Sequence, residues 1–485
     1  MSTSVSRSSR PSAASSVAPP DEAPHTLTEA APRTLGLLDQ LGLWGNLGVS
    51  LLGFAGAVAV LQPSGASPLG LTAAIVAIVT GSVLGGLILG ATLVLGARTG
   101  APAMVLLRGL LGAKASFVPT VLNIAQCLGW AVFELFVISS GLQALSRGHL
   151  PSWLCVVVAG AVTTGLTLRP LGAIRVLRKY VSVLVVLSMI VLAVGLLRRP
   201  TGAITGSWGG FWLAVDAVIA LTISWVPLGA DYSRHSRSAR SAFAGGFLGY
   251  GVTQVACLLI GVVALTQLGS SNGDQIPDLF LTLPLGTVAF AILVLRETDQ
   301  SFANVYSTAV SIQNMAPRWD RRILTVLIGA GTTVLALTVD VSQYENFLYL
   351  IGAVFIPLSG ALVAGWARSR VAVAPPAPVV DGSSSAEPTA LVAVWDVSDA
   401  APVRPGMIAA WIIGFVVYQL INPGGIAGWS SFWTRMGTDL HLIGHPWLSA
   451  SIASFVVAVL VALPFASPKA GQVSPRQAAS QNIHS

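Results

Sequence analysis

Twelve apolar segments, each long enough to cross a lipid bilayer, dominate the chain. A membrane-spanning helix needs about 20 predominantly apolar residues. The 485 residues are 54% hydrophobic and only 9% charged, which excludes a soluble globular protein of this length and predicts an all-α polytopic membrane protein with 12 transmembrane helices. The predicted spans 1 to 12 cover residues 37–61, 69–96, 116–145, 151–168, 180–197, 210–230, 241–268, 284–313, 322–339, 344–367, 406–423 and 447–466.

The segments between and beyond the spans predict a ten-helix core with flexible additions. Residues 1–35 are rich in Ser, Ala and Pro and lack the apolar core of a signal peptide, so we expect a disordered N-terminal tail. The Pro/Ser/Ala-rich stretch 371–405 predicts a flexible linker after a core of residues 36–370. Residues 406–466 then form helices 11 and 12, and residues 467–485 form a C-terminal tail.

The basic residues are distributed unequally between the two ends of the predicted spans. On the side that carries both tails lie 21 of the 26 Lys and Arg residues, and 4 lie on the opposite side. The positive-inside rule therefore predicts cytoplasmic termini and a cytoplasmic linker in a protein of the cell membrane. This asymmetry explains the net charge of +7 without a nucleic-acid partner.

Spans 1 and 6 carry residues that interrupt helices. Span 1 has Gly45, Gly48, Gly53 and Gly56, and span 6 has the sequence SWVPLG at residues 224–229. Interrupted helices at matching positions of two halves indicate an inverted-repeat transporter, although Gly and Pro are also common in membrane helices.

Span 3 carries Gln126, Trp130 and Glu134 at i, i+4, i+8 spacing, on one face of a helix. A carboxylate at the centre of a membrane helix costs roughly 2.5–3.5 kcal/mol on insertion scales. We therefore expect this face to look into a polar cavity, where the three side chains suit a flat, hydrogen-bonding ring. The alternative is a helix–helix contact in which a protonated Glu134 bonds to a neighbouring hydroxyl.

Other intramembrane acids favour structural roles. Asp216 opens span 6 and is as compatible with an interfacial location as with a site, and Glu297 and Asp299 flank Arg296, which predicts a structural ion pair.

A group of neutral oxygens follows in span 8. The hydroxyls of Ser301, Ser307 and Thr308, with carbonyls freed by a broken span 1 near Gly48, offer the oxygens that a sodium ion needs. Ordinary interhelical hydrogen bonding explains them equally well.

The sequence carries no signature of an enzyme or a metal centre. All six histidines fall in tails or loops, the pair His441/His445 lacks convincing helical context, and the three cysteines have no metal or disulfide spacing. No Walker loop, nucleophile elbow or HExxH motif is present. We expect no cofactor other than a coupling ion, and neither a membrane enzyme nor an ATP-driven pump.

Three stretches resemble the nucleobase:cation symporter-1 family. GARTGAPAMVLLRGLLGAKASFVPTVLNIAQCLGW (96–130) is similar to the family's loop 2–3 and span 3, SWVPLGADYSR (224–234) to the end of its span 6, and FANVYSTAVS (302–311) to its span 8. The resemblance covers roughly residues 35–370 and looks most similar to the branch of cytosine permeases and hydroxymethylpyrimidine transporters.

The resemblance implies a LeuT-like fold of two inverted five-helix repeats, about 36–200 and 208–370, plus two extra helices. The substrate would lie between spans 1, 3, 6 and 8, with Trp130 stacked on its ring and Gln126 at its edge. The resemblance also points to Ser224 and Asn304. Thr222 stands where some members have a second aromatic residue, so Trp225 would complete the stack, and Glu134 stands where some relatives have an amide.

These observations predict a monomeric cation symporter that imports a nucleobase or related pyrimidine, coupled to Na⁺ or H⁺. The runner-up is transport of allantoin, a hydantoin or an amino acid on the same fold. A passive channel or a transport-dead sensor is the competing class.

Overall fold

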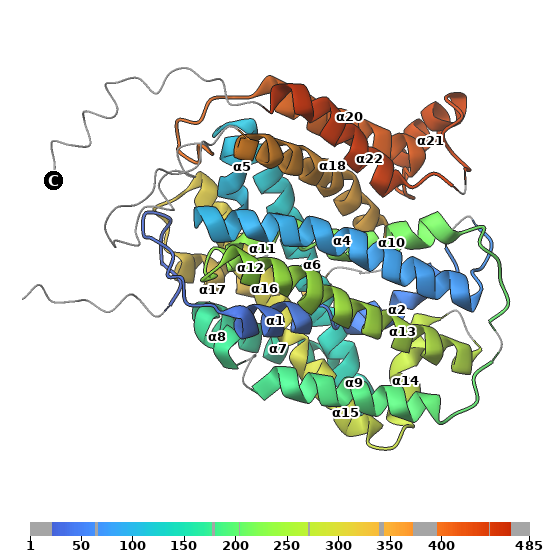
Figure 1. The fold of residues 1–485 in the computed structure, drawn as a ribbon. Helices are drawn as coiled ribbons and strands as arrows, with labels where there is room; N and C mark the ends of the chain where they lie inside the picture. The colour runs from blue at the N-terminus through green and yellow to red at the C-terminus, as the bar shows by residue number, and fades with distance from the viewer. Residues whose placement is uncertain are drawn as a thin grey trace, which may run out of the picture.

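The computed structural model shows a bundle of helices that run roughly parallel and antiparallel to one another (Figure 1). It describes residues 22–63, 66–176, 180–202, 204–269, 272–338, 344–371, 395–445 and 447–466. The predictions for residues 1–21, 372–394 and 467–485 therefore lie outside the described residues. In the described part, the helices of spans 10, 11 and 12 pack together along one side of the bundle (Figure 1).

Every one of the twelve predicted segments contains helix, as the apolar runs require. Six described helices are long and apolar enough to cross a membrane, and the number rises to eight if each of two bent pairs is one span. Twelve crossings remain a prediction. The main helices are α1 (Leu37–Leu47), α2 (Leu51–Ala55), α3 (Ala57–Leu61), α4 (Leu71–Thr99), α5 (Ala103–Leu111), α6 (Phe117–Leu145), α7 (Ser152–Leu168), α8 (Pro170–Val176), α9 (Ser182–Leu197), α10 (Phe211–Ile223), α11 (Val226–Ser233), α12 (Ala239–Ala244), the π-helical turn η2 (Gly245–Tyr250), α13 (Gly251–Leu268), α15 (Gly286–Arg296), α16 (Thr298–Met315), α17 (Arg321–Thr338), α18 (Tyr344–Val371), α20 (Pro405–Ile421), α21 (Trp429–Asp439) and α22 (Ala450–Ala462).

Span 1 is broken where its glycines predict a break. Helix α1 ends at Leu47, α2 begins at Leu51, and the two halves of the span meet at an angle of 53°. Span 6 is interrupted more mildly between α10 and α11, at Ser224 and Trp225. Both interruptions free backbone groups that would otherwise bond within a helix, and these groups need partners because lipid offers none.

Glycines in α4 bring spans 2 and 6 into close contact. A Cβ atom at Gly81 would lie 2.6 Å from the Val218 side chain, and one at Gly85 would lie 2.8 Å from Thr222. No larger residue fits at either position without displacing α10, so small residues set the approach of these two helices.

The structure departs from the predicted disordered tail at residues 22–35. The Glu22 carboxylate accepts hydrogen bonds from the Leu171 and Gly172 amides at the start of α8 (2.8 and 3.1 Å). The buried Arg321 guanidinium donates to the Pro24 and Thr167 carbonyls. Specific polar contacts therefore hold a segment whose composition suggests disorder.

The predicted flexible linker likewise ends in an ordered stretch. The Trp395 indole is buried and donates to the Leu106 carbonyl (2.9 Å). Arg404 donates to the Gly109 carbonyl (2.8 Å), and Arg108 pairs with Asp399. Residues 395–404 therefore pack on α5, and Trp395 also contacts Trp366 of α18.

Asp216, for which an interface or a site was expected, caps a helix. Its carboxylate accepts hydrogen bonds from the Ser449 hydroxyl and from the Ala450 and Ser451 amides at the start of α22. The carboxylate satisfies free N–H groups at the end of that helix and ties span 6 to span 12.

His235 joins the N-terminal segment to the loop after α11. Its Nδ1–H donates to the Pro32 carbonyl (3.0 Å), and the Leu35 amide donates to the His235 carbonyl (2.9 Å). Burial, with the nearby Arg234 charge, lowers the pKa of His235 to about 3. The imidazole is therefore neutral in the folded protein at neutral pH.

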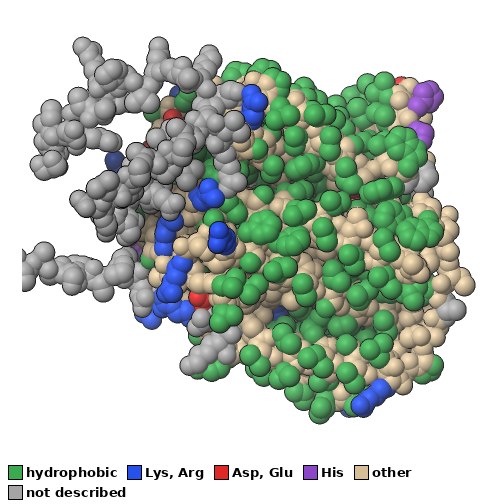
Figure 2. All heavy atoms as spheres, viewed as in Figure 1, with side chains coloured by type: hydrophobic (Ala, Val, Ile, Leu, Met, Phe, Trp, Pro, Cys, Tyr) green, Lys and Arg blue, Asp and Glu red, His purple; other side chains and the backbone are tan. Residues whose placement is uncertain are grey.

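Exposed Lys and Arg side chains gather on the left of the face in Figure 2, whereas apolar side chains cover much of the rest. Four of the exposed basic residues lie in the loops after α11 and α16 or in the first turn of the helix that follows each loop: Arg237, Arg240, Arg318 and Arg322. This separation is the pattern expected of a protein surrounded by lipid with one basic side.

The neutral state of His235 predicts acid lability. Its pKa rises from about 3 to 6.5 on unfolding, so the unfolded chain binds the extra proton and stability is lost as pH falls below 6.5. We expect the Tm of the wild type to fall between pH 6.5 and pH 4 and the fall to be smaller in His235→Asn. The exposed His149→Asn serves as the control, and equal slopes in all three proteins would contradict this role.

The topology can be tested by single-cysteine labelling in intact cells. Cysteines at Gly273 and Gly424 should react with a membrane-impermeant reagent, whereas one at Ala400 should react only after the membrane is opened. All three positions lie outside the predicted spans. Labelling of Ala400→Cys in intact cells would overturn the predicted orientation.

Candidate functional site

A small cavity lies beside the break of span 1. It has a volume of about 40 Å³ and is lined by residues of spans 1, 3, 6, 7 and 8. Pockets that bind drug-sized ligands typically have roughly 300–1,000 Å³. The walls must therefore separate before a ring-sized ligand can enter.

Two tryptophans form aromatic walls of this cavity. Trp130 comes from α6 and Trp225 from the interruption between α10 and α11. Trp225 is fixed by edge-to-face contacts with Trp44 and Tyr250 at ring-centroid distances of 6.3 and 6.5 Å. Trp130 contacts Phe347 of α18 at 5.6 Å. Such indoles offer rigid flat surfaces for an aromatic ligand.

Polar groups complete the lining. Glu134 lies one helical turn after Trp130, and Asn304 and Gln300 come from α16. The Glu134 side chain is buried, and its Oε2 atom has no hydrogen-bond partner among the residues that the structure describes. A buried acceptor of this kind suits a ligand that presents N–H donors.

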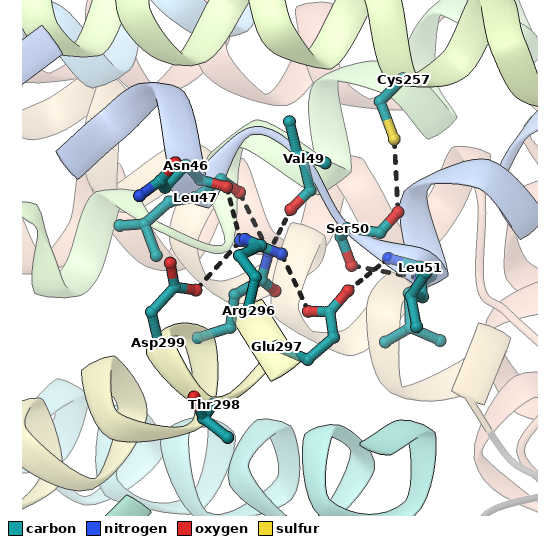
Figure 3. Close-up of polar contacts among 12 residues, drawn as sticks. Asn46, Leu47, Val49, Ser50, Leu51, Cys257, Arg296, Glu297, Thr298 and Asp299 are labelled. Carbon is teal, nitrogen blue, oxygen red and sulfur yellow. Dashed lines mark hydrogen bonds and ion pairs between the residues drawn. The ribbon is translucent and has the colours of Figure 1, made fainter. Parts of the chain in front are cut away.

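Residues of span 8 bridge the break of span 1 (Figure 3). Arg296 donates to the Asn46 carbonyl, and Gln300 donates to the Leu47 and Val49 carbonyls at 3.2 and 2.9 Å. On the other side of the break, Glu297 accepts from the Leu51 amide. The side chains thus replace the backbone bonds that an unbroken helix would make.

The predicted ion pair of span 8 is present. Arg296 lies 3.0 Å from Glu297 Oε2 and 3.1 Å from Asp299 Oδ1, and all three side chains are buried. The expected structural role was an ion pair within span 8. The cluster also stabilises span 1, because the Arg296 guanidinium faces the C-terminal, negative end of α1 (Figure 3).

The six residues expected at the substrate do not all reach the cavity. Its lining includes Trp130, Glu134, Ser224, Trp225 and Asn304. Gln126 instead donates to the Ser224 carbonyl (3.2 Å) and to Asn123 (2.9 Å), so it holds the interruption of span 6. The sequence analysis missed Gln300 and Tyr250, although an amide within a membrane span was a signal for the first.

The four residues expected at a cation are spread over two places. Gly48 lines the cavity at the break of span 1. Ser307 lies beside Asp231 and Tyr232 of α11, and the Thr308 hydroxyl donates to the Asn304 carbonyl (2.8 Å). Ser301 is fully buried. These hydroxyls are not hydrogen-bonded to the freed carbonyls of span 1 in the described contacts.

A second, larger cavity of about 310 Å³ lies among α3, α10, α18 and α20. Its polar lining includes Asp216, Asn346, Tyr349, Tyr418 and Asn422. Phe347, from the same first turns of α18, contacts Trp130 of the small cavity. The beginning of α18 therefore lies next to both spaces.

The comparisons with known proteins agree with a transporter. A family model described as permease for cytosine/purines, uracil, thiamine, allantoin matches residues 44–381. No curated protein matches the chain. Mhp1, a nucleobase-cation-symport-1 family transporter in a closed conformation with bromovinylhydantoin bound, has a TM-score of 0.67 at 18% identity over 92% of this chain and 94% of its own.

Two other solved structures have a similar fold. Mhp1 in its inward-facing conformation has a TM-score of 0.63 at 16% identity over 97% of this chain and 96% of its own. A Na⁺-coupled sialic acid symporter in a substrate-bound outward-open state has a TM-score of 0.52 at 12% identity over 90% of both chains. These likenesses show that the chain has a LeuT-type fold.

The aromatic walls generate a direct test. If Trp130 stacks on a ligand ring, Trp130→Ala should abolish uptake of cytosine, the probe base, because it removes both the buried apolar area and the stacking contact. Trp130→Phe should retain part of the uptake, because a phenyl ring keeps a stacking contact of about 0.5–1.5 kcal/mol beyond area burial. The exposed Trp153→Ala is the matched control. Uptake by Trp130→Ala at the wild-type rate, with equal protein in the membrane, would exclude this wall as a binding surface.

Proposed function

Because the chain belongs to the family of permeases for cytosine/purines, uracil, thiamine and allantoin, we propose that it imports a nucleobase or related pyrimidine, such as cytosine or hydroxymethylpyrimidine, together with a cation. The family is one of multi-pass membrane transporters, not of enzymes. We place this protein in the cell membrane with cytoplasmic termini, acting as a monomer by alternating access.

The observation that carries the proposal is the pairing of two indoles and a buried carboxyl group around one cavity. Trp130 and Trp225 supply faces for a planar ring, and Glu134 supplies acceptors one turn away. In an aminopyrimidine the exocyclic amine is a donor and the ring nitrogen beside it is an acceptor, so a carboxylic acid matches both groups: its carbonyl oxygen accepts and its O–H donates. Asn304 supplies a carbonyl and an amide for the remaining edge of the ring.

Alternating access is supported by the location of the cavity. It lies at the interruptions of spans 1 and 6, the place where transporters with repeated halves bind their substrates. Its present volume leaves no open path for a ring, which favours a carrier over a passive channel. Saturable, concentrative uptake would separate these two classes.

The substrate is tested by competition in proteoliposomes that contain the purified protein. We expect unlabelled cytosine and hydroxymethylpyrimidine to compete with radiolabelled cytosine and uracil to compete more weakly, because uracil lacks the exocyclic amine. Allantoin, a hydantoin and an aromatic amino acid complete the panel. The exposed Asp278→Asn is the control for charge removal outside the cavity.

Counterflow exchange of cytosine without any ion gradient decides between these substrate classes. Exchange that only the pyrimidines inhibit supports the proposal. Exchange that allantoin or the hydantoin inhibits best would move the substrate to the runner-up class. Absence of exchange with every compound in the panel would contradict transport of these ligands altogether.

A further inference from the structure

The charged cluster at the break of span 1 contains more acid than base. Glu134, Glu297 and Asp299 are all buried near a single guanidinium, that of Arg296. If all three carboxyl groups were ionised, two negative charges would lie unbalanced in the interior of a membrane protein. Burial of unpaired charge is costly, so the cluster must bind protons to reduce its charge.

Glu134 and Glu297 supply the place for such a proton. Their carboxyl groups lie close together across the contact of α6 with span 8. Two ionised carboxylates that are buried side by side repel each other, whereas one carboxylic acid can donate to one carboxylate. The contact therefore favours one proton on the pair.

The position in which a sodium ion would meet span 1 is already occupied. In transporters with broken helices, carbonyls at the end of the first half-helix coordinate the coupling cation. Here the Asn46 carbonyl accepts from Arg296 (Figure 3). The Leu47 and Val49 carbonyls accept from Gln300. The Arg296 guanidinium and the Gln300 side-chain amide thus occupy the carbonyl oxygens that a sodium ion would need.

We propose that the coupling ion of this transporter is a proton carried by the Glu134–Glu297 carboxyl pair, and that the Arg296 guanidinium takes the place of sodium at the break of span 1. The inference rests on the proposed function, because it names the ion of the same transport cycle. A hydronium ion on the loading side gives its proton to the pair, and water on the opposite side takes the proton back.

Substrate and proton are coupled through the shared carboxyl group. The exocyclic amine of an aminopyrimidine donates to one Glu134 oxygen, and the ring nitrogen beside it accepts the O–H of the other, so the ring is bound best when the proton of the pair resides on Glu134. With that proton present, Arg296 balances one of the two remaining negative charges. Each ligand therefore favours binding of the other, which is the thermodynamic requirement of symport.

The other polar groups near the pair are accounted for. Asp299 is paired with Arg296, and the Cys257 thiol donates to the Ser50 carbonyl (3.3 Å). The Tyr250 hydroxyl donates to the Leu221 carbonyl (3.2 Å). Glu297 pairs with Arg296 and accepts from the Leu51 amide. Among the described residues, this leaves Glu134 as the acid of the cluster whose Oε2 atom has no fixed partner.

The transport test compares two gradients in the same proteoliposomes, with cytosine as the probe. An acid-outside gradient should concentrate cytosine, up to about tenfold per pH unit for one proton per substrate. Replacement of sodium by choline should leave uptake and the Tm of the wild type unchanged. Accumulation driven by a sodium gradient at equal pH, or a Tm raised by sodium, would overturn the proposal.

Glu297→Gln separates coupling from binding, because it keeps an acceptor for the Leu51 amide but cannot release a proton. We expect it to lose accumulation under the pH gradient while counterflow exchange of cytosine persists. Asp278→Asn should accumulate cytosine as the wild type does. Wild-type accumulation by Glu297→Gln would overturn the role of the pair.

A spectroscopic measurement decides the matter without substrate. Infrared difference spectra of the purified protein in lipid should contain a carboxylic acid band that shifts in D₂O and disappears at alkaline pH. Glu134→Gln and Glu297→Gln should each remove the same component of this band, and Asp278→Asn should retain it. A band intact in both glutamine variants would refute the shared proton.

The two proposals fail in distinguishable ways. Absence of counterflow with every base contradicts the proposed substrate class, whereas the infrared band and the sodium response of the Tm still report on the pair. Counterflow together with sodium-driven accumulation contradicts the proton alone.

Discussion

The break of span 1 exists because span 8 satisfies the backbone groups that the break sets free. An unsatisfied carbonyl or amide in the hydrocarbon region costs several kcal/mol. Arg296 and Gln300 cover three carbonyls, and Glu297 covers the amide of Leu51. Without these side chains, the unpaired groups would favour a continuous helix. The cavity wall at residues 48–50 would then be lost, so the candidate site depends on this contact.

The same contact fixes where span 8 lies along span 1. Buried ion pairs contribute little net stability, but they discriminate strongly against arrangements in which one partner is left alone. A shift of span 8 by one turn would separate Arg296, the last residue of α15, from Asn46 and would leave a guanidinium and carboxylates without partners. This register also brings Asn304, one turn after Gln300, to the cavity that Trp130 lines.

The sequence predicts much of this arrangement and misses what depends on rotation and on distant partners. Gly48 marks the break, and Trp130 and Glu134 face the cavity as their spacing requires. Residues eight apart on a helix differ by about 80° in direction, and Gln126 accordingly turns to the interruption of span 6 instead. The Arg296 pair was predictable from adjacent charges. Its bond to span 1 was not, because no sequence pattern tells which backbone carbonyls lie free.

The glycines of α4 have a consequence for motion. Because Gly81 and Gly85 let the Val218 and Thr222 side chains approach the α4 backbone, spans 2 and 6 interlock over successive turns. Sliding or separating these helices would open voids that no side chain fills. The two helices should thus behave as a single rigid body. The movement that admits a solute must then occur in helices that contact spans 2 and 6 through larger side chains than glycine, such as α18.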